Sequence, residues 1–206
     1  TASVFMENRI EFLATIIALN KMGITAALIN TNLTGRPLAH CISVTKSKKC
    51  IVGEERLEQL SGIKDDLELK DGEDFLVVKD QEEVAAPNWA IDLSQVAAQQ
   101  DESNPPETVE RTLGETALYI FTSGTTGLPK AAIMSNRRYL SSAALAAVAG
   151  LKCTPQDTLY LCLPLYHTTG LLIGAGSAFH SGAAMFIRRK FSASNFLPEA
   201  RDHDCT

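Results

Sequence analysis

The sequence lacks the basic excess of a nucleic-acid-binding protein. Its 19 lysines and arginines are outnumbered by 24 acidic residues, which gives a formal net charge of −5. A nucleic-acid-binding surface normally needs clustered positive charge, so we expect no nucleic-acid partner. The acidic residues are themselves concentrated, because residues 54–110 contain 17 of them and only 4 of the basic residues. This pattern favours a solvated acidic lobe over an acidic docking surface.

Cysteine is also scarce, and its spacing carries no motif. The chain has five cysteines, an odd number, and no two of them form a C-x-x-C pair. We therefore expect free thiols in a reducing compartment, most of them packed as small apolar groups. The five are Cys41, Cys50, Cys153, Cys162 and Cys205.

Charged residues are absent from residues 158–187. This interval is longer than the roughly 20 residues that a membrane-spanning helix needs. However, it contains a proline, two histidines and four glycines, and its pattern is that of strand, loop, helix and strand. We therefore predict a buried α/β unit in preference to a membrane span.

What is present indicates an α/β fold. Hydrophobic residues make up 45% of the chain, enough for a substantial core. Residues 1–53 alternate strand, helix, strand, helix and strand, which predicts a parallel sheet covered by helices, with Asn8 as the cap of the first helix. Residues 54–115 are acidic and less regular, with a helix expected at 91–99. Strands and helices return in residues 116–206, where a helix is expected at 136–148.

The most informative stretch is Tyr-Ile-Phe-Thr-Ser-Gly-Thr-Thr-Gly-Leu-Pro-Lys, residues 119–130. It begins as an apolar strand, then becomes rich in hydroxyl groups and glycine, and it ends in a lysine without any acid. Gly124 and Gly127 can adopt positive φ and let a ligand approach the backbone. Successive N–H groups, hydroxyls and Lys130 would then surround an anion, which predicts a polyphosphate-binding loop. The alternative is an ordinary Gly/Thr turn between strands.

A Walker-type P-loop is disfavoured as the explanation of this stretch. The spacing from Gly124 to Lys130 is that of G-x-x-x-x-G-K-[ST]. Pro129, however, stands where the second glycine should be, and Ala131 replaces the hydroxyl residue that binds magnesium.

The whole string resembles the phosphate-binding signature of the adenylate-forming enzymes, which include acyl-CoA synthetases, luciferases and peptide-synthetase adenylation domains. Its form is most similar to the fatty acid transport protein/very-long-chain acyl-CoA synthetase branch. The resemblance implies an α/β fold with parallel-rich sheets flanked by helices, as a fragment of the N-terminal large domain of such an enzyme. It also implies that ATP activates a long- or very-long-chain fatty acid to an acyl-adenylate, which then gives acyl-CoA.

The resemblance assigns roles to the residues of the string. Residues 123–127 would hold the departing β- and γ-phosphates, and Lys130 would neutralise charge there. Thr122 is a candidate contact for Mg²⁺, which prefers oxygen ligands. ATP, Mg²⁺ and coenzyme A are the implied cofactor and substrates. The residues assigned to the nucleotide and its phosphates are Tyr119, Thr122, Ser123, Gly124, Thr125, Thr126, Gly127 and Lys130.

A second group of polar residues lies in Leu-Pro-Leu-Tyr-His-Thr-Thr-Gly, residues 163–170, which follows a predicted strand. Ligands of open α/β sheets bind beyond the carboxyl ends of the strands. On its own, a histidine beside a tyrosine is more often a packed or helix-capping residue. The segment nevertheless resembles the one that lines the acyl end of the family's active site. The resemblance implies that Tyr166, His167, Thr168 and Gly170 line the acyl site, with His167 near the carboxylate–adenylate junction.

Two further positions bear on the resemblance. These enzymes often carry a histidine a few residues after the signature lysine, where this chain has Asn136, which we expect to serve as a helix cap. The basic run Arg188, Arg189 and Lys190 also resembles the fatty acid transport branch. It would attract anionic lipid headgroups at a membrane surface, or it forms a basic surface at a strand end.

The family's adenine, ribose and C-terminal lysine motifs are not found in this sequence. We therefore expect the C-terminal part of the enzyme to lie outside the chain and these 206 residues to be inactive alone. The sequence also begins with a predicted strand that has no lead-in and ends after a predicted helix, so we expect both ends to be truncated. The alternatives are a fatty-acid uptake or binding module, another acyl- or aryl-activating enzyme, and a generic nucleotide-binding domain. The last requires the 119–130 loop to lie away from Tyr166 and His167. We expect the protein in the cytoplasm or at the cytoplasmic face of a membrane.

Overall fold

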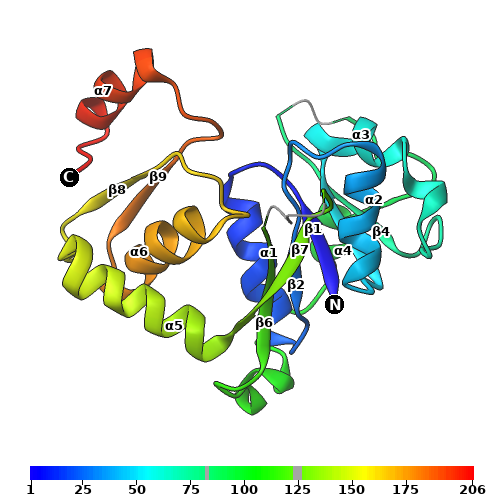
Figure 1. The fold of residues 1–206 in the computed structure, drawn as a ribbon, viewed down its shortest axis with the longest axis horizontal. Coiled ribbons are helices and arrows are strands. Elements are labelled where there is room, and N and C mark those ends of the chain that lie inside the picture. The colour runs from blue at the N-terminus through cyan, green and yellow to red at the C-terminus, as the bar shows by residue number, and fades with distance from the viewer. Residues whose placement is uncertain (82–83, 123–126) are drawn as a thin grey trace.

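The computed structural model describes residues 1–81, 84–122 and 127–206, which form two sheets with helices packed around them (Figure 1). The larger sheet has the strand order β5-β4-β3-β1-β2-β6-β7, and the smaller joins β8 to β9. Every strand pair is parallel except the antiparallel pair of β6 and β7. The strands are β1 (Ala2–Phe5), β2 (Ala26–Leu28), β3 (Lys49–Gly53), β4 (Phe75–Val78), β5 (Ile91–Asp92), β6 (Thr116–Thr122), β7 (Lys130–Ser135), β8 (Thr158–Leu161) and β9 (Ala184–Ile187).

Helical segments connect most of the strands. The α-helices are α1 (Ile10–Lys21), α2 (Gly35–Val44), α3 (Leu57–Ser61), α4 (Leu93–Ala97), α5 (Asn136–Leu145), α6 (Gly176–Ser181) and α7 (Ala193–Asp202). Wider π-helical turns extend α5 and precede α6, as η4 (Ala146–Leu151) and η5 (Thr169–Ala175). Short 3₁₀ segments are η1 (Glu54–Arg56), η2 (Lys64–Asp66) and η3 (Pro106–Glu110).

The centre of the larger sheet confirms the parallel arrangement that residues 1–53 predict. Strand β1 pairs in parallel with β2 on one side and β3 on the other. Both β1 and β2 are buried along their whole length, which explains the continuous apolar sequence of β2, since strands covered on both faces have no solvent-facing positions. The one polar residue of β1, Ser3, is paired with the Ser47 hydroxyl at 2.7 Å. The α/β class with a parallel-rich sheet is therefore confirmed.

The two faces of this sheet bury separate apolar clusters. Successive side chains of a strand point to opposite faces, so Val4 packs with helix α1 and Phe5 packs with helices α2 and α3. Figure 1 shows α1 on one side of the sheet, and α2 and α3 on the other. The cluster on the α1 side also contains Leu161, Leu165 and Leu171 from the smaller sheet and its connections. The cluster on the α1 side is therefore one continuous core that joins the two sheets.

The charge-free residues 158–187 form strand β8, a turn, the helical pair η5 and α6, and strand β9, as the sequence predicts. Within the described part of the chain, no helix has both the length and the apolar character needed to cross a membrane. The prediction of an α/β unit for this segment is confirmed, but its burial is partial, because η5 and α6 contribute buried residues while β8 and β9 are mostly half-buried.

The cysteines are free, as predicted. Cys41 and Cys50 lie in the core beside α2 and β3, where burial raises the pKa of each thiol to about 12. These two thiols therefore act as small apolar packing groups.

Several local predictions were wrong, for identifiable reasons. Helix α1 is preceded by Arg9, which has no side-chain cap, and the Asn8 side chain bonds to distant segments instead. The cap of α5 is Ser135, whose hydroxyl accepts the Arg138 N–H at 3.3 Å, so Asn136 is the first helical residue. The helix expected at 91–99 is in part strand β5, because Asp92 caps α4 by accepting two backbone N–H groups.

Candidate active site

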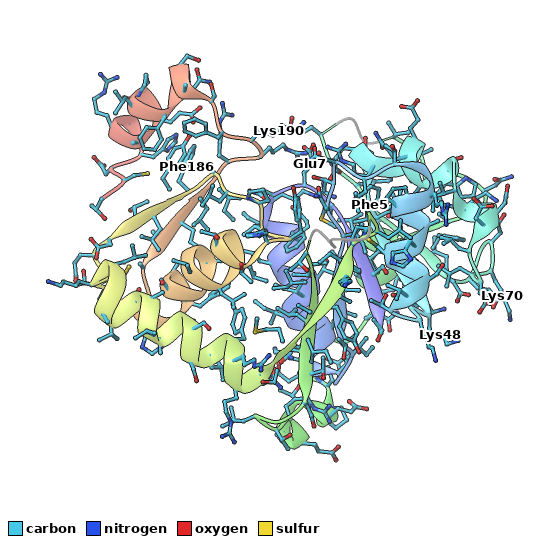
Figure 2. The ribbon with its side chains drawn as sticks, in the orientation of Figure 1. Phe5, Glu7, Lys48, Lys70, Phe186 and Lys190 are labelled. Atoms are coloured by element: carbon cyan, nitrogen blue, oxygen red, sulfur yellow. The ribbon has the colours of Figure 1, made fainter. Side chains whose placement is uncertain are left out.

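The predicted site residues come from both sheets: the signature loop follows β6 of the larger sheet, and residues 163–170 follow β8 of the smaller one. Strands β1, β2 and β6 are adjacent and parallel, and Leu28 of β2 is level with Ile120 of β6. The loops after β2 and β6 therefore leave the sheet side by side at its carboxyl edge. In Figure 2, Glu7 follows β1 at this edge, whereas Lys48 lies at the opposite, amino edge just before β3.

The signature loop closes an antiparallel hairpin. Thr122, the last residue of β6, is paired with Lys130, the first residue of β7, and both are exposed. Gly127 has a φ of 93°, which confirms that this glycine adopts the positive φ expected of it. Ser123, Gly124, Thr125 and Thr126 lie outside the described residues. A P-loop runs from a strand into a helix, whereas the residues described after this loop form a strand, so the P-loop is excluded on topology.

The far end of the loop is attached to helix α2. The Nε2 atom of His40 lies 3.1 Å from the carbonyl oxygen of Pro129. A carbonyl can only accept, so Nε2 carries the proton and donates. This bond places the residue before Lys130 against α2 and so fixes where β7 begins.

Tyr166 reaches back to the loop that follows β2. The amide Nδ2 of Asn32 donates to the Tyr166 hydroxyl at 3.3 Å. Burial raises the pKa of Tyr166, and this effect is opposed by hydrogen bonds from Thr31 and Asn32 and by the positive charge of Arg56. The phenol is therefore neutral at physiological pH, and its hydroxyl meets the loop that follows β2, the neighbour of β6.

His167 is exposed and is oriented by its own turn. The backbone N–H of Thr169 donates to Nδ1 of His167 at 3.4 Å. A backbone N–H cannot accept, so Nδ1 is the acceptor, and in the neutral ring the proton lies on Nε2. The Nε2–H group is then available to donate to an oxygen of a ligand.

Gly170 is required by the packing of the 163–170 segment. A Cβ atom at this position would overlap the carbonyl oxygen of Pro164 and would lie 2.6 Å from the carbonyl oxygen of Leu163. Thr168 is half-buried and directly precedes η5. The start of η5 can pack this closely against the backbone of Leu163 and Pro164 only because Gly170 has no side chain.

The structure thus brings the described ends of the signature loop and the Tyr166–His167 pair to one edge of the sheet. It places Asn136 away from them. Asn136 lies at the other end of β7, where its backbone N–H donates to the Glu115 carbonyl before β6 begins. The roles assigned to the site residues remain predictions. Sequence reasoning missed the supporting residues Thr31, Asn32 and His40. Thr31 and Asn32 follow soon after the buried strand β2, and this position could have indicated a role at the carboxyl edge of the sheet.

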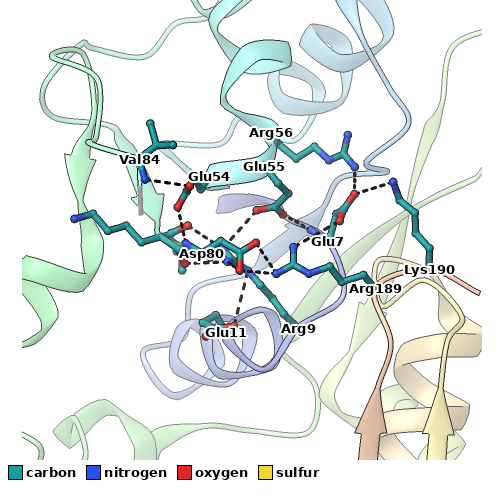
Figure 3. Close-up of polar contacts among 12 residues, drawn as sticks. Glu7, Arg9, Glu11, Glu54, Glu55, Arg56, Asp80, Val84, Arg189 and Lys190 are labelled. Atoms are coloured by element: carbon teal, nitrogen blue, oxygen red, sulfur yellow. Dashed lines mark hydrogen bonds and ion pairs between the residues drawn. The ribbon is translucent and has the colours of Figure 1, made fainter. Parts of the chain in front are cut away.

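The basic run after β9 is engaged in ion pairs within the chain. Arg188 pairs with Glu199 at 3.0 Å, and Lys190 pairs with Glu7 at 3.2 Å. Arg189 pairs with both Asp80 and Glu7, and Figure 3 shows these contacts joining the end of β9 to the carboxyl edge of the larger sheet. The interpretation of a basic surface at a strand end is favoured over a patch free to bind lipid headgroups.

We predict a pH-dependent contribution of Asp80 to stability. Burial acts to raise the pKa of Asp80, but the hydrogen bond from Arg189 and the positive charges of Arg9 and Arg189 outweigh it, so the pKa is lowered. A carboxylate with a lowered folded-state pKa stabilises the fold above its unfolded pKa of about 4, and this stabilisation is lost as the pH falls through the folded value. Asp80→Asn should therefore lower the free energy of unfolding by about 1–3 kcal/mol at pH 7.

Urea unfolding of wild type and Asp80→Asn at a series of pH values checks this prediction. The difference between the two should shrink below about pH 4, where the wild-type carboxylate becomes protonated. Asp66→Asn is the control, because Asp66 is exposed and should show little difference at any pH. An Asp80→Asn difference that stays constant down to pH 2 would contradict the ionic explanation.

Comparison with known proteins identifies the family. A family model described as "AMP-binding enzyme" matches residues 1–206, the whole chain. The chain belongs to the AMP-binding enzyme family. This AMP-binding chain is 34% identical over 207 residues to long-chain fatty acid transport protein 1 of Rattus norvegicus, covering 99% of the chain and 31% of that protein. It is 32% identical over 196 residues to the medium/long-chain-fatty-acid–CoA ligase FadD6 of Mycobacterium tuberculosis, covering 95% of the chain and 31% of that protein.

Solved structures of similar fold include acyl-CoA ligases. The long-chain-fatty-acid–CoA ligase FadD1 of Archaeoglobus fulgidus superposes with a TM-score of 0.79 at 21% identity, over 100% of this chain and 38% of that one. The N-terminal domain of FACL13 from Mycobacterium tuberculosis gives a TM-score of 0.80 at 20% identity, over 99% of this chain and 48% of that one. At these identities the likeness shows the fold. The AMP-binding chain spans about a third of the length of the curated relatives that it matches.

Proposed function

We propose that the complete protein containing this chain is an AMP-forming fatty acid–CoA ligase, an acid–thiol ligase of the fatty acid transport/very-long-chain branch. Family membership and the names of the relatives support an acyl-activating enzyme. The observation that carries the proposal is the bond between Tyr166 and Asn32, which brings the segment with Tyr166 and His167 to the loop after β2. Strand β2 is the parallel neighbour of β6, from which the signature hairpin begins, and α/β sheets bind ligands at the carboxyl ends of such strands.

In the first half-reaction, the carboxylate oxygen of the fatty acid attacks the α-phosphorus of ATP, and pyrophosphate leaves. Residues 123–127 would donate hydrogen bonds to the departing β- and γ-phosphates, and the Lys130 ammonium would neutralise their charge. Tyr119 would support the loop from within β6. The Nε2–H of His167 would donate to the reacting carboxylate, and Tyr166, Thr168 and Gly170 would shape the entrance for the acyl chain.

Mg²⁺ would be held mainly by the phosphates of ATP. Among the described residues, no group of three or more His, Cys, Asp or Glu side chains could hold a metal ion. Mg²⁺ commonly takes one or two protein oxygens together with substrate phosphates and water. The exposed hydroxyl of Thr122, opposite Lys130, fits that limited requirement. When bound, the ion would offset the negative charge of the triphosphate.

In the second half-reaction, the thiol of coenzyme A attacks the acyl carbon of the acyl-adenylate, and AMP leaves. The relatives are about three times as long as this chain, and we assign the groups that bind adenine, ribose and coenzyme A to parts of the protein beyond these residues. We accordingly expect these 206 residues alone to form no acyl-CoA. We place the protein in the cytoplasm or at the cytoplasmic face of a membrane, where ATP and coenzyme A are present.

Fatty-acid-dependent exchange of labelled pyrophosphate into ATP tests the proposed function. The complete protein should catalyse exchange when a long-chain fatty acid is added, and subsequent addition of coenzyme A should yield acyl-CoA and AMP. A fatty alcohol of the same chain length is the matched control, because it lacks the carboxylate nucleophile and should support no exchange. Binding of fatty acid without any exchange would overturn the proposal in favour of a binding or uptake module.

A further inference from the structure

Asn8 is a buried polar residue that joins three separate segments of the chain. It belongs to the turn of residues 7–9, which follows β1, and its side chain is only 5% exposed. Its Nδ2 donates to the carbonyl of Leu163 at 2.9 Å and to the carbonyl of Arg188 at 3.2 Å. Its Oδ1 accepts the backbone N–H of Leu165 at 2.8 Å. All three bonds run to residues more than 150 positions away in the sequence.

These bonds fix the start of the segment that carries Tyr166 and His167. Leu165 is fully buried and is the residue directly before Tyr166. The turn then closes with the N–H of His167 donating to the Pro164 carbonyl at 3.1 Å. The Leu163 and Pro164 carbonyls also pack closely against Gly170. Asn8 and Gly170 therefore both hold this turn, Asn8 by its hydrogen bonds and Gly170 by the space that it leaves.

Only an amide satisfies this arrangement. Two carbonyl oxygens need donors and one N–H needs an acceptor, and a primary amide supplies both groups at a fixed spacing. A carboxylate in its place would keep the acceptor but would set an oxygen against two carbonyl oxygens. An alanine would remove all three bonds, two of them part-buried and one buried. The Leu165 N–H, whose bond is buried, would then lack a partner, which costs more than the bond itself contributes.

The residues on either side of Asn8 make their bonds elsewhere. Glu7 pairs with Lys190 at 3.2 Å and also with Arg189 and Arg56. Arg9 donates to the carbonyls of Val78 and Lys79 at 2.8 and 2.9 Å. The pairs of Glu7 with Arg189 and Lys190, drawn in Figure 3, tie the segment after β9 to the larger sheet, whereas Arg9 bonds within the larger sheet. Within the 7–9 turn, Asn8 is the residue that bonds to the backbone of residues 163–165.

We propose that Asn8 is a positioning residue that sets the place of Tyr166 and His167 relative to the signature loop. The proposal rests on the proposed function, because it gives Asn8 a role in orienting the groups that meet the fatty-acid carboxylate. Displacement of a reacting group by about 1 Å is enough to lower a rate by roughly 100-fold. A residue that contacts no substrate can therefore have a large effect on the rate.

Hydrogen exchange tests the positioning itself, whatever the protein catalyses. In the complete protein, Asn8→Asp and Asn8→Ala should increase amide exchange of a peptide covering residues 163–171, with peptides from β2 and β6 unchanged. Asn20→Ala is the matched control. Asn20 also donates a long-range side-chain bond, to Asn136 at 2.9 Å, but it does so at the amino edge of the sheet. Unchanged exchange of residues 163–171 in a folded Asn8→Asp variant would overturn the proposal.

Kinetics of pyrophosphate exchange separate positioning from mere loss of folded protein. We expect Asn8→Asp to lower kcat by roughly 10- to 100-fold per folded molecule while the KM for ATP is retained. Asn20→Ala should leave kcat unchanged. An Asn8→Asp loss that disappears after correction for the folded fraction would show a purely structural role and overturn the proposal.

The two proposals fail in different ways. If wild-type protein shows no fatty-acid-dependent exchange, the proposed ligase function fails, and the hydrogen-exchange result still decides whether Asn8 positions residues 163–170. If wild type is active and Asn8→Asp retains full kcat, the ligase function stands and the role of Asn8 fails.

Discussion

Lys130→Ala is expected to lower fatty-acid-dependent pyrophosphate exchange of the complete protein by about 100- to 1,000-fold, as loss of one group that stabilises developing charge typically does. Lys130 is exposed at the first position of β7 and lies across the hairpin from Thr122. Its backbone makes the strand pairing, which alanine preserves, so the loss would come from the missing ammonium group. The measurement is the initial rate of label transfer from pyrophosphate to ATP at saturating fatty acid.

Lys48→Ala provides the matched control for Lys130→Ala. Lys48 is equally an exposed lysine, but it lies at the amino edge of the sheet, as Figure 2 shows. Its removal should leave the exchange rate near that of wild type. If the Lys130→Ala rate stays within about tenfold of wild type, the assignment of Lys130 to phosphate neutralisation is wrong, since one such charge contributes more than this.

Variants of the same loop can also distinguish a ligase role from a transport role. A Lys130→Ala, Thr126→Ala double variant should lose acyl-CoA formation if the signature loop binds ATP. If fatty-acid uptake by cells expressing the double variant persists at the wild-type level, an uptake role independent of ligation is supported.

Gly170→Ala is expected to lower the free energy of unfolding by about 1–3 kcal/mol or more, the usual cost of inserting atoms where there is no space. The new methyl group would meet the Pro164 and Leu163 carbonyls, which are backbone atoms that cannot rotate away. Relief of this clash would move the turn that carries Tyr166 and His167, so exchange activity should fall as well. Urea unfolding monitored by circular dichroism measures the first effect.

Gly150→Ala is the matched control for Gly170→Ala. Gly150 lies in η4, has no positive φ, and a Cβ atom added there meets nothing within 4 Å. Its replacement should change stability by less than about 1 kcal/mol, in the stabilising direction, because alanine restricts the unfolded chain. If the two variants were equally stable, close packing would not explain why residue 170 is a glycine.

Much of the fold follows from local sequence pattern. The alternation of strands and helices in residues 1–53, with a continuous apolar run at β2, predicts buried parallel strands, and the structure confirms them. The charge-free 158–187 region predicts an α/β unit from its glycines, its proline and its strand–helix–strand pattern. The helix expected at 91–99 is present but shorter, since Asp92 belongs to β5 and caps a helix that begins at Leu93 and ends at Ala97.

The candidate site was less predictable than the fold. The signature loop and the Tyr166–His167 pair could be picked from the sequence, because each is a run of chemically distinctive residues. Asn8 could not, because its partners at Leu163, Leu165 and Arg188 are set by how the two sheets meet. A helix-capping asparagine and a long-range linking asparagine look identical until tertiary packing is known. The same holds for Arg189 and Lys190, whose carboxylate partners lie on other elements.

The antiparallel return of the signature loop has a consequence for how a triphosphate would be stabilised. In a P-loop the anion sits at the start of a helix, whose macrodipole contributes about half a positive charge that does not depend on any side chain. Here the residues described after the loop enter strand β7, and strands carry only small net dipoles. The attraction must then come from the loop's own N–H and hydroxyl groups, the metal ion and the exposed ammonium of Lys130. Charge at an exposed side chain is screened by salt, so ATP affinity in this protein should weaken with ionic strength more steeply than in a P-loop enzyme.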